Sequence, residues 1–215
     1  MIRDYREMTV SSWPERSSAG LAPILARLYP LVDPQAAPGE GPNGIVTPSS
    51  VQVHVLHLAS SGLILPHVDN VEASGSVIAG VSLGDTRVLR MSRAMEEGQH
   101  AAFDVLLESG SVYVQRCVLP LILRDKFNCI LCRDDVRYSW KHEIPNTAQF
   151  QGSTVGGGQR MSVMLRVSRS LSVVAHLPSK TYSCPYRIDT LRTQSDIPLL
   201  HCLTRFLLAI FTLAS

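Results

Sequence analysis

The feature that most constrains the fold is a series of short β-rich runs that begins at Ser50, with no helical pattern of useful length between its members. In the first run, "VQVHVLHL", valines alternate with Gln52 and His54, which is the period of a strand with one buried face. Further runs, separated by glycine, serine and aspartate, are "SVIAGVSLG", "TRVLRM", "AAFDVLLESGSVYVQR" and "QRMSVMLRVS". Repeated strands without crossover helices favour an antiparallel sandwich or barrel.

The first 48 residues have a different character. Residues 13–28 predict a helix, because Pro14 suits a first helical turn and leucine or isoleucine recurs with helical spacing at positions 21, 24, 25 and 28. Residues 30–48 are rich in proline, glycine and asparagine, which is typical of a linker or a long loop. We therefore expect an N-terminal helical segment and linker over residues 1–48, followed by a β-rich core over residues 49–169.

The charge balance and the cysteines narrow the class of protein. The formal net charge is +2 at pH 7, which gives no strong signature of a nucleic-acid-binding protein. The five cysteines are an odd number without small-domain spacing, so a reducing compartment is favoured over a disulfide framework. Cys129 and Cys132 form a C-x-x-C, but no second pair accompanies it, so we expect no zinc site.

The apolar segments do not predict a membrane partner. The first 18 residues lack the long apolar core of a secretory signal, and their acidic residues disfavour a transit peptide. The most apolar stretch, residues 197–215, is interrupted by His201 and Arg205 and is marginal in length for a span of about 20 residues. We therefore expect neither a membrane span nor an evident targeting segment.

The stretch "LILPHVDN" places His67 and Asp69 two residues apart at the end of an apolar run. On a strand, residues i and i+2 point to the same face, so the imidazole and the carboxylate would converge on one point. A shared metal ion is one interpretation. The other is a solvated turn, because proline, aspartate and asparagine favour turns.

A metal site at this point needs a third ligand. Two histidines and one carboxylate, with three positions left open, suit the non-haem Fe(II) oxygenases. His142, in "RYSWKHEIP", follows an aromatic-rich strand candidate, and a neighbouring strand could bring it to the pair. His54 and His57 would lie further down the strand of His67, away from its end. The alternative for each histidine is a hydrogen-bonded structural role.

Two arginines frame the run "RMSVMLR". On a strand, a spacing of six residues puts Arg160 and Arg166 on the same face, together with Ser162 and Met164. Two inward cations need anionic partners, and a dicarboxylate would supply them; an edge strand with solvated arginines is the alternative. Tyr113, in "SVYV", could add a hydroxyl group to the same anion, or be an ordinary strand aromatic.

The H-x-D pair, the distal histidine and the R-x5-R frame, in this order, resemble the AlkB family of Fe(II)- and 2-oxoglutarate-dependent dioxygenases. The flanks "VHVLHLASSGLILPHVDNVEASGSVIAGVSLGDTRVLRM", "ESGSVYV" and "RYSWKHEI" carry the same resemblance, which covers residues 3–169 with two gaps and points to a mitochondrial branch of the family. It implies a double-stranded β-helix, a jelly-roll fold, in agreement with the mainly β pattern. It also implies an iron site made of His67, Asp69 and His142.

The resemblance implies the remaining roles as well. Arg160, helped by Tyr113, would bind the distal carboxylate of 2-oxoglutarate, and Arg166 would lie near the co-substrate or the substrate. The implied reaction consumes 2-oxoglutarate and dioxygen, releases succinate and carbon dioxide, and oxidises a prime substrate, here an unidentified protein or RNA. A mitochondrial matrix location and a part in programmed necrosis and fatty acid metabolism are implied in the same way.

Two stretches depart from the family pattern. Residues 117–133 appear as an insertion between the runs that contain Tyr113 and His142, and residues 170–215 have no family counterpart. Because both break from the β-patterned flanks, we expect unspliced or mis-assigned coding sequence, which sequencing of the transcript tests. An insertion at this point could turn His142 to the other face. The alternative to an active dioxygenase is therefore a catalytically impaired scaffold or interaction protein, whereas a cupin-like module with other chemistry would not need the two arginines.

Overall fold

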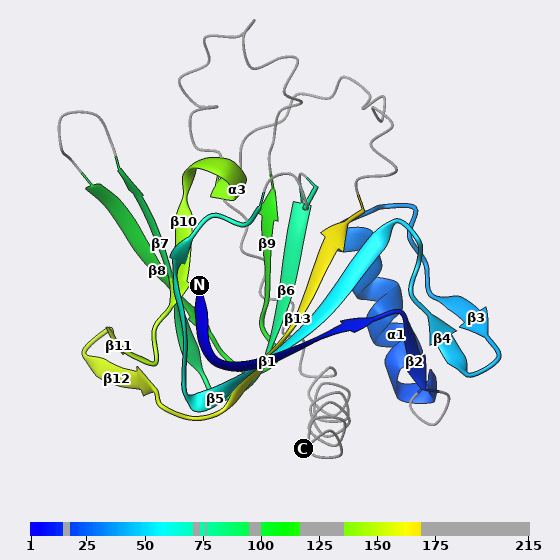
Figure 1. Cartoon of the computed structure of the whole chain (residues 1–215), viewed down its shortest axis with the longest axis horizontal. Coiled ribbons are helices and arrows are strands. Elements are labelled where there is room, and N and C mark those ends of the chain that lie inside the picture. Colours follow the sequence, from blue (N-terminus) through cyan, green and yellow to red (C-terminus); the bar gives the residue numbers. More distant parts are fainter. Residues whose placement is uncertain (15–17, 71–73, 76, 95–99, 117–135, 169–215) are drawn as a thin grey trace, which may run out of the picture.

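The computed structural model describes residues 1–14, 18–70, 74–75, 77–94, 100–116 and 136–168. The prediction of a mainly β, jelly-roll-like fold is confirmed, because an eight-stranded antiparallel sheet curls into a nearly closed barrel (Figure 1). Its strand order is β8-β7-β10-β5-β13-β6-β9, with β1 paired to β5. These strands are β1 (Ile2–Val10), β5 (Val51–His67), β6 (Val77–Gly84), β7 (Arg87–Ala94), β8 (His100–Leu107), β9 (Val112–Arg116), β10 (Lys141–Ile144) and β13 (Arg160–Val167).

Smaller elements flank the barrel. Two short sheets are formed by β2, β4 and β3 and by β11 and β12. The helical elements described are α1, a short 3-10 turn that follows it, and α3 before β10. Their bounds are β2 (Ser12–Pro14), α1 (Ser18–Leu28), η2 (Tyr29–Leu31), β3 (Gly39–Gly41), β4 (Gly44–Val46), α3 (Val136–Ser139), β11 (Thr147–Phe150) and β12 (Ser153–Gly156).

Strand β5 is shared by the two halves of the barrel. Residues 51–58 pair with β13, whereas Ile64 and His67 pair with Ile144 and His142 on β10. Between these stretches, the register against β1 shifts, so that residues 59–62 stand opposite Asp4 alone. The resulting bulge bends the strand from one half of the barrel to the other.

The two faces of the sheet are buried in different ways. On the outer face, Val53, Val81 and Val163 form a core with Leu21 and Leu25 of α1, which covers this side of the sheet (Figure 1). On the inner face a second cluster, which includes Leu56, Leu58, Met91 and Trp140, packs inside the barrel. Because strand side chains alternate, the residues between the outward-facing valines point inward.

The prediction of a helix from residue 13 is wrong at its start. Trp13 lies in β2, where it pairs with Ile45 of β4, is buried, and donates a hydrogen bond from Nε1 to the hydroxyl group of Tyr29 at 3.1 Å. Burial of the indole ring against the small sheet outweighs the helical pattern, and the helix begins only at Ser18. Further towards the N-terminus, Ile2–Val10 forms β1, which joins the main sheet. The expected linker, residues 30–48, contains the strands β3 and β4.

Several expectations fall on residues that the structure does not describe. These are the insertion at 117–133, the Cys129–Cys132 pair, the segment 197–215 and the tail from residue 170. The boundaries at 48 and 169 remain predictions. In the described parts of the chain, no helix is long and apolar enough to cross a membrane.

Candidate metal and co-substrate site

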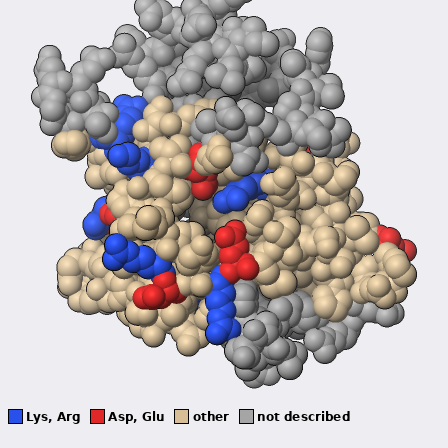
Figure 2. Space-filling model, viewed as in Figure 1, with Lys and Arg blue, Asp and Glu red and all other residues tan. Residues whose placement is uncertain are grey.

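The polar residues singled out in the sequence meet in one pocket inside the barrel. Its walls come from β1, β5, β9, β10, β13 and the loop that follows β5, and Figure 2 shows a hollow on this face with acidic and basic side chains at its rim. The pocket contains about 500 Å³ of space, part of it open to solvent. Its lining residues are Ile2, Glu7, His54, Leu56, Ile64, His67, Asp69, Tyr113, His142, Ile144, Arg160, Ser162, Met164 and Arg166.

His67, Asp69 and His142 converge on one point. His67 is the last residue of β5, Asp69 follows two residues later outside the strand, and His142 pairs with His67 in the β5–β10 ladder. Asp69 Oδ1 lies 3.6 Å from His67 Nε2, and Asp69 Oδ2 lies 4.0 Å from His142 Nε2. One ligand atom from each residue lies within 4.8 Å of the others, so the three could hold a single metal ion.

The orientation of the His67 ring suits metal binding. Its Nδ1 lies 2.8 Å from the carbonyl oxygen of Leu65, and a carbonyl can only accept, so Nδ1 carries the hydrogen and donates it. Nε2 is the ring nitrogen that faces Asp69 and would bind a metal ion. A ligating histidine held through its other ring nitrogen is the usual arrangement at metal sites.

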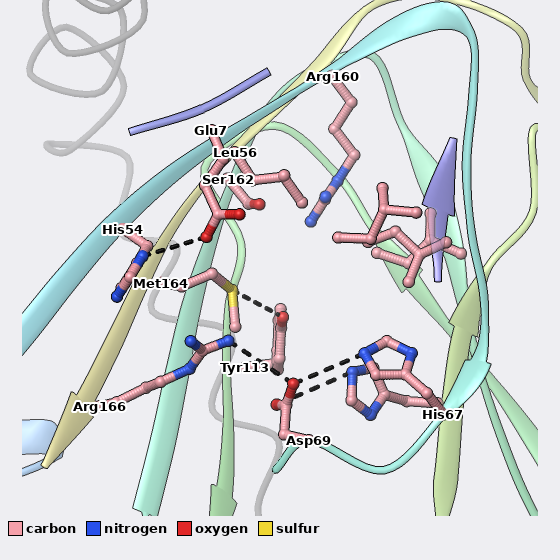
Figure 3. A pocket seen from close by; sticks show the side chains of 14 residues that line it. Glu7, His54, Leu56, His67, Asp69, Tyr113, Arg160, Ser162, Met164 and Arg166 are labelled. Carbon is pink, nitrogen blue, oxygen red and sulfur yellow. Dashed lines mark hydrogen bonds and ion pairs between the residues drawn. The ribbon is translucent and has the colours of Figure 1, made fainter. Parts of the chain in front are cut away.

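Charge around Asp69 also suits a cation at this point. Burial pushes the pKa of Asp69 upward, but the hydrogen bond with His67 and the charges of His142 and Arg166 outweigh it and lower the pKa to about 2. The same hydrogen bond raises the pKa of His67 against the effect of burial. Arg166 Nη2 lies 3.6 Å from Asp69 Oδ1, so it holds the carboxylate from the side away from the histidines (Figure 3). Asp69 is therefore an ionised carboxylate at neutral pH.

Arg160 presents an unsatisfied guanidinium group to the pocket. It is 1% exposed, and its Nε donates a hydrogen bond to Ser82 Oγ at 3.1 Å. Nη1 and Nη2 are buried and have no hydrogen-bond partner among the described residues. Burial lowers the pKa of Arg160 to about 10, so it remains a cation at neutral pH. A planar fork of free donors fits the two oxygens of a carboxylate.

Tyr113 stands beside this fork because of a glycine. Gly80 on β6 pairs with Tyr113 on β9, and a Cβ on Gly80 would lie 2.4 Å from two ring atoms of the tyrosine. The ring occupies that vacant space, and its hydroxyl group donates a hydrogen bond to Met164 Sδ at 3.2 Å. Burial raises the pKa of Tyr113, so the phenol keeps its proton and can donate to an anion.

All six residues selected from the sequence therefore line the same pocket, while their individual roles remain predictions. Arg160 and Arg166 do share the inner face of β13 with Ser162 and Met164, as expected from their spacing. The expected strand before His142 is wrong, because residues 136–139 form α3. The insertion could have turned His142 to the other face of the sheet, but the side chain of His142 faces Asp69.

Two ionisable residues of the pocket, Glu7 and His54, are not among the six site residues predicted from the sequence. Glu7 lies in a stretch for which no strand was predicted, so nothing placed it near the site. His54 was expected further down the strand of His67, away from its end, and it does lie on β5 well before His67. The alternation of residues 51–55 already indicated that His54 faces away from the valines, and this signal could have placed it in the pocket.

Comparison with known proteins supports the resemblance. Protein-family models give no match. The chain is 32% identical over 167 residues to a protein of Bos taurus named alpha-ketoglutarate-dependent dioxygenase alkB homolog 7, mitochondrial, and 31% identical over 166 residues to the Mus musculus protein of that name. Each match covers 77% of this chain and 61% of the relative, so the chain spans about three fifths of the length of these curated relatives.

Solved structures add only weak likenesses. OsALKBH1 has a TM-score of 0.40 at 14% identity, with 77% of this chain and 80% of that chain covered. A Pseudomonas putida prolyl-4-hydroxylase has a TM-score of 0.35 at 13% identity, with 77% and 93% covered. The relationship therefore rests on sequence. The resemblance to the AlkB family is confirmed by this similarity, and the chain is a sequence relative of AlkB homologue 7.

Proposed function

We propose that this chain is an Fe(II)- and 2-oxoglutarate-dependent dioxygenase of the AlkB type. The observation that carries the proposal is the presence, in one pocket, of a His-Asp-His cluster and a buried guanidinium group whose terminal nitrogens have no described partner. The cluster fits a divalent metal ion, and the guanidinium group fits one carboxylate of a dicarboxylate. The names of the sequence relatives support the same activity.

Each part of the pocket has a task in this proposal. His67, Asp69 and His142 would hold Fe(II), and Arg166 keeps Asp69 in place. When bound, Fe(II) and 2-oxoglutarate supply the oxidation of a carbon–hydrogen bond by dioxygen, with succinate and carbon dioxide as products.

The co-substrate would lie between the metal cluster and the buried fork. Arg160 and Tyr113 would receive its distal carboxylate, since both present donors to the same region of the pocket. Leu56, Ile64 and Ile144 form apolar walls, which suit the two methylene groups of 2-oxoglutarate and exclude water from its contacts.

The proposal extends to location and substrate. The relatives are named mitochondrial, which supports a mitochondrial location for this chain, in the matrix by resemblance. The prime substrate would be a protein or an RNA, and the biological process would be the control of programmed necrosis and fatty acid metabolism. Direct identification of oxidised products in mitochondrial extracts tests both points.

The decisive experiment uses purified protein without oxygen. Fe(II) and 2-oxoglutarate are titrated by calorimetry, oxygen is admitted, and succinate is measured, with His67→Ala as the matched control. We expect binding and succinate from the parent protein and neither from the variant. If the parent protein binds neither ligand, the dioxygenase proposal is wrong, and the impaired scaffold becomes the better explanation.

A further inference from the structure

The pocket contains a second polar pair that the proposed iron and 2-oxoglutarate chemistry does not use. His54 Nδ1, on β5, lies 3.1 Å from Glu7 Oε1, on β1. In Figure 3 this pair lies on the other side of Met164 from Asp69, and both residues line the pocket. The pair is therefore placed to contact a molecule that enters the pocket beside the metal cluster.

The sheet fixes the position of this pair. His54 stands opposite Met164 of β13, and Glu7 stands opposite Leu56 of β5. All four residues line the pocket, so the polar pair adjoins a thioether and a leucine side chain on the same inner face. An aliphatic chain with a polar end would find apolar contact and a hydrogen-bonding group side by side.

The hydrogen-bonding groups of His54 and Glu7 determine which kind of polar group on the ligand they can bind. A carboxylate can only accept, so His54 Nδ1 carries the hydrogen and donates it to Glu7 Oε1. Within the described parts of the chain, Glu7 Oε2 makes no hydrogen bond, and the side chain is 41% exposed. Glu7 thus offers a second carboxylate oxygen as an acceptor, which matches a cationic donor.

Glu7 is also the carboxylate that remains for such a ligand. The described lining residues include two carboxylates, and Asp69 is already engaged by His67 and Arg166. We propose that Glu7, oriented by His54, binds the ammonium or guanidinium group of the prime substrate, a lysine or arginine side chain of a protein. This inference rests on the proposed function and specifies its substrate class.

The same observations favour a protein over an RNA. Tyr113 is the one Phe, Tyr or Trp ring among the described lining residues, and it is buried, so only imidazole rings and arginine side chains are left for a base to stack on. The exposed carboxylate of Glu7 repels phosphate groups on its side of the pocket, and the net charge of +2 gives little attraction for a polyanion.

Three pools of fluorescent heptapeptides test the proposal. The flanking positions are random neutral residues, and the central residue is lysine, norleucine or glutamate. Binding is measured by fluorescence polarisation to protein loaded with Mn(II) and 2-oxoglutarate without oxygen. We expect the parent protein to bind the lysine pool at least roughly tenfold more tightly than the norleucine pool, the effect of one charge-assisted hydrogen bond.

The variants separate recognition from a structural tie between β1 and β5. Glu7→Gln should lose the preference for lysine, and Glu7→Lys should prefer the glutamate pool. Glu40→Gln, which removes an exposed carboxylate from β3 outside the pocket, should keep the parent preference. A structural tie alone would lower the melting temperature of Glu7→Gln and leave the ratio of affinities for the lysine and norleucine pools unchanged.

Three results would overturn the inference. They are equal binding of the lysine and norleucine pools by the parent protein, an unchanged ratio in Glu7→Gln, and tighter binding of a random oligoribonucleotide pool than of any peptide pool. Loading with Mn(II) and 2-oxoglutarate is measured first by calorimetry. If loading fails, the proposed function fails by that result alone, and the peptide ratios are then measured on the unloaded protein.

Discussion

In Arg160, ligand binding and stability are in conflict. The side chain is fully buried, and the terminal nitrogens of its guanidinium group have no described partner. A buried cation without an anion lowers the free energy of unfolding, while the same free donors bind a carboxylate strongly. Arg160 therefore contributes to ligand binding rather than to the stability of the ligand-free protein.

Replacement of this arginine separates the two effects. In Arg160→Met, we expect the affinity for 2-oxoglutarate to fall by roughly 100-fold or more, because the buried partner of its carboxylate is lost. The melting temperature of the ligand-free protein should stay the same or rise, since the unpaired charge is removed. Calorimetry and a thermal melt measure both, and a large loss of stability with unchanged affinity would contradict the role.

The pH dependence of binding follows from the same group. Burial lowers the pKa of Arg160 to about 10, so the guanidinium group is charged below pH 10 and loses its proton as the pH rises through that value. Affinity for glutarate, which has both carboxylates but no keto group, should be constant from pH 7 to 9 and weaken towards pH 10.5. Calorimetric titrations across this range test the prediction, and a decline already between pH 7 and 8 would assign the binding to another group.

The effect of this titration on stability has the opposite sign. Because the folded-state pKa lies below the unfolded one, the charged form is disfavoured by folding. The penalty is fully present below about pH 10 and decreases as the pH rises from there towards the higher pKa of the unfolded chain. Arg160→Met should lack this component of the pH dependence.

Among the elements, β6 positions a side chain that belongs to its neighbour. The β6–β9 and β6–β13 ladders put Gly80 between Tyr113 and Met164, and the missing side chain leaves room for the tyrosine ring. Strand β6 thus shapes the site because it has no side chain at position 80.

Gly80→Ala should displace that ring. The new Cβ would overlap two ring atoms, so we expect a loss of about 1–3 kcal/mol in the free energy of unfolding and a roughly tenfold weaker affinity for 2-oxoglutarate. Gly39→Ala is the matched control, because its Cβ would meet ordinary contacts at 3.5 Å or more. In a Tyr113→Ala background, Gly80→Ala should cause no further loss of affinity, and an undiminished additional loss would refute the mechanism.

The sequence predicted the core strands better than the N-terminal elements. In β5 and β13, one face packs against the outer core, so hydrophobic alternation is visible in the sequence. In β1, "IRDYREMTV", charged side chains interrupt this pattern, because much of the strand is exposed. Its strand conformation depends on pairing with β5, a contact that no local pattern records.

At the scale of the whole molecule, Arg87 links three separate parts of the barrel. Its buried guanidinium group donates hydrogen bonds to the carbonyl oxygens of Ser60 in the β5 bulge, Pro145 and Asn146 after β10, and Gly158 before β13. One side chain thereby satisfies backbone groups of three connections that are far apart in the sequence.

Arg87→Met should therefore be strongly destabilising. We expect a loss of roughly 2–5 kcal/mol in the free energy of unfolding, because buried carbonyl groups lose their donor. Arg90→Met is the control: Arg90 pairs with Asp104 at 2.9 Å but is 38% exposed, so its loss should cost only about 0.5 kcal/mol. Chemical denaturation measures both, and similar losses in the two variants would contradict the linking role of Arg87.

Much of the site, but not its supports, could be predicted from the sequence. The metal and co-substrate residues form short motifs with fixed spacing, and the resemblance to a family gave their order. Arg87, Gly80 and Glu7 have no motif, since each acts through a partner brought close only by folding. Long-range contacts of this kind arise from the closure of the barrel, which hydrophobic periodicity does not describe.

The shared strand β5 also determines how the barrel opens. The first part of β5 pairs with β13, its last part pairs with β10, and β1 pairs with both parts. Separation of one half of the barrel would therefore also disrupt the strand pairs of the other half. In hydrogen–deuterium exchange, amides at both ends of this strand should therefore gain deuterium at one common slow rate, whereas those of the two-stranded β11–β12 sheet exchange sooner. The exchange rate of amides along this seventeen-residue strand would thus report the opening of the whole fold around the candidate metal site.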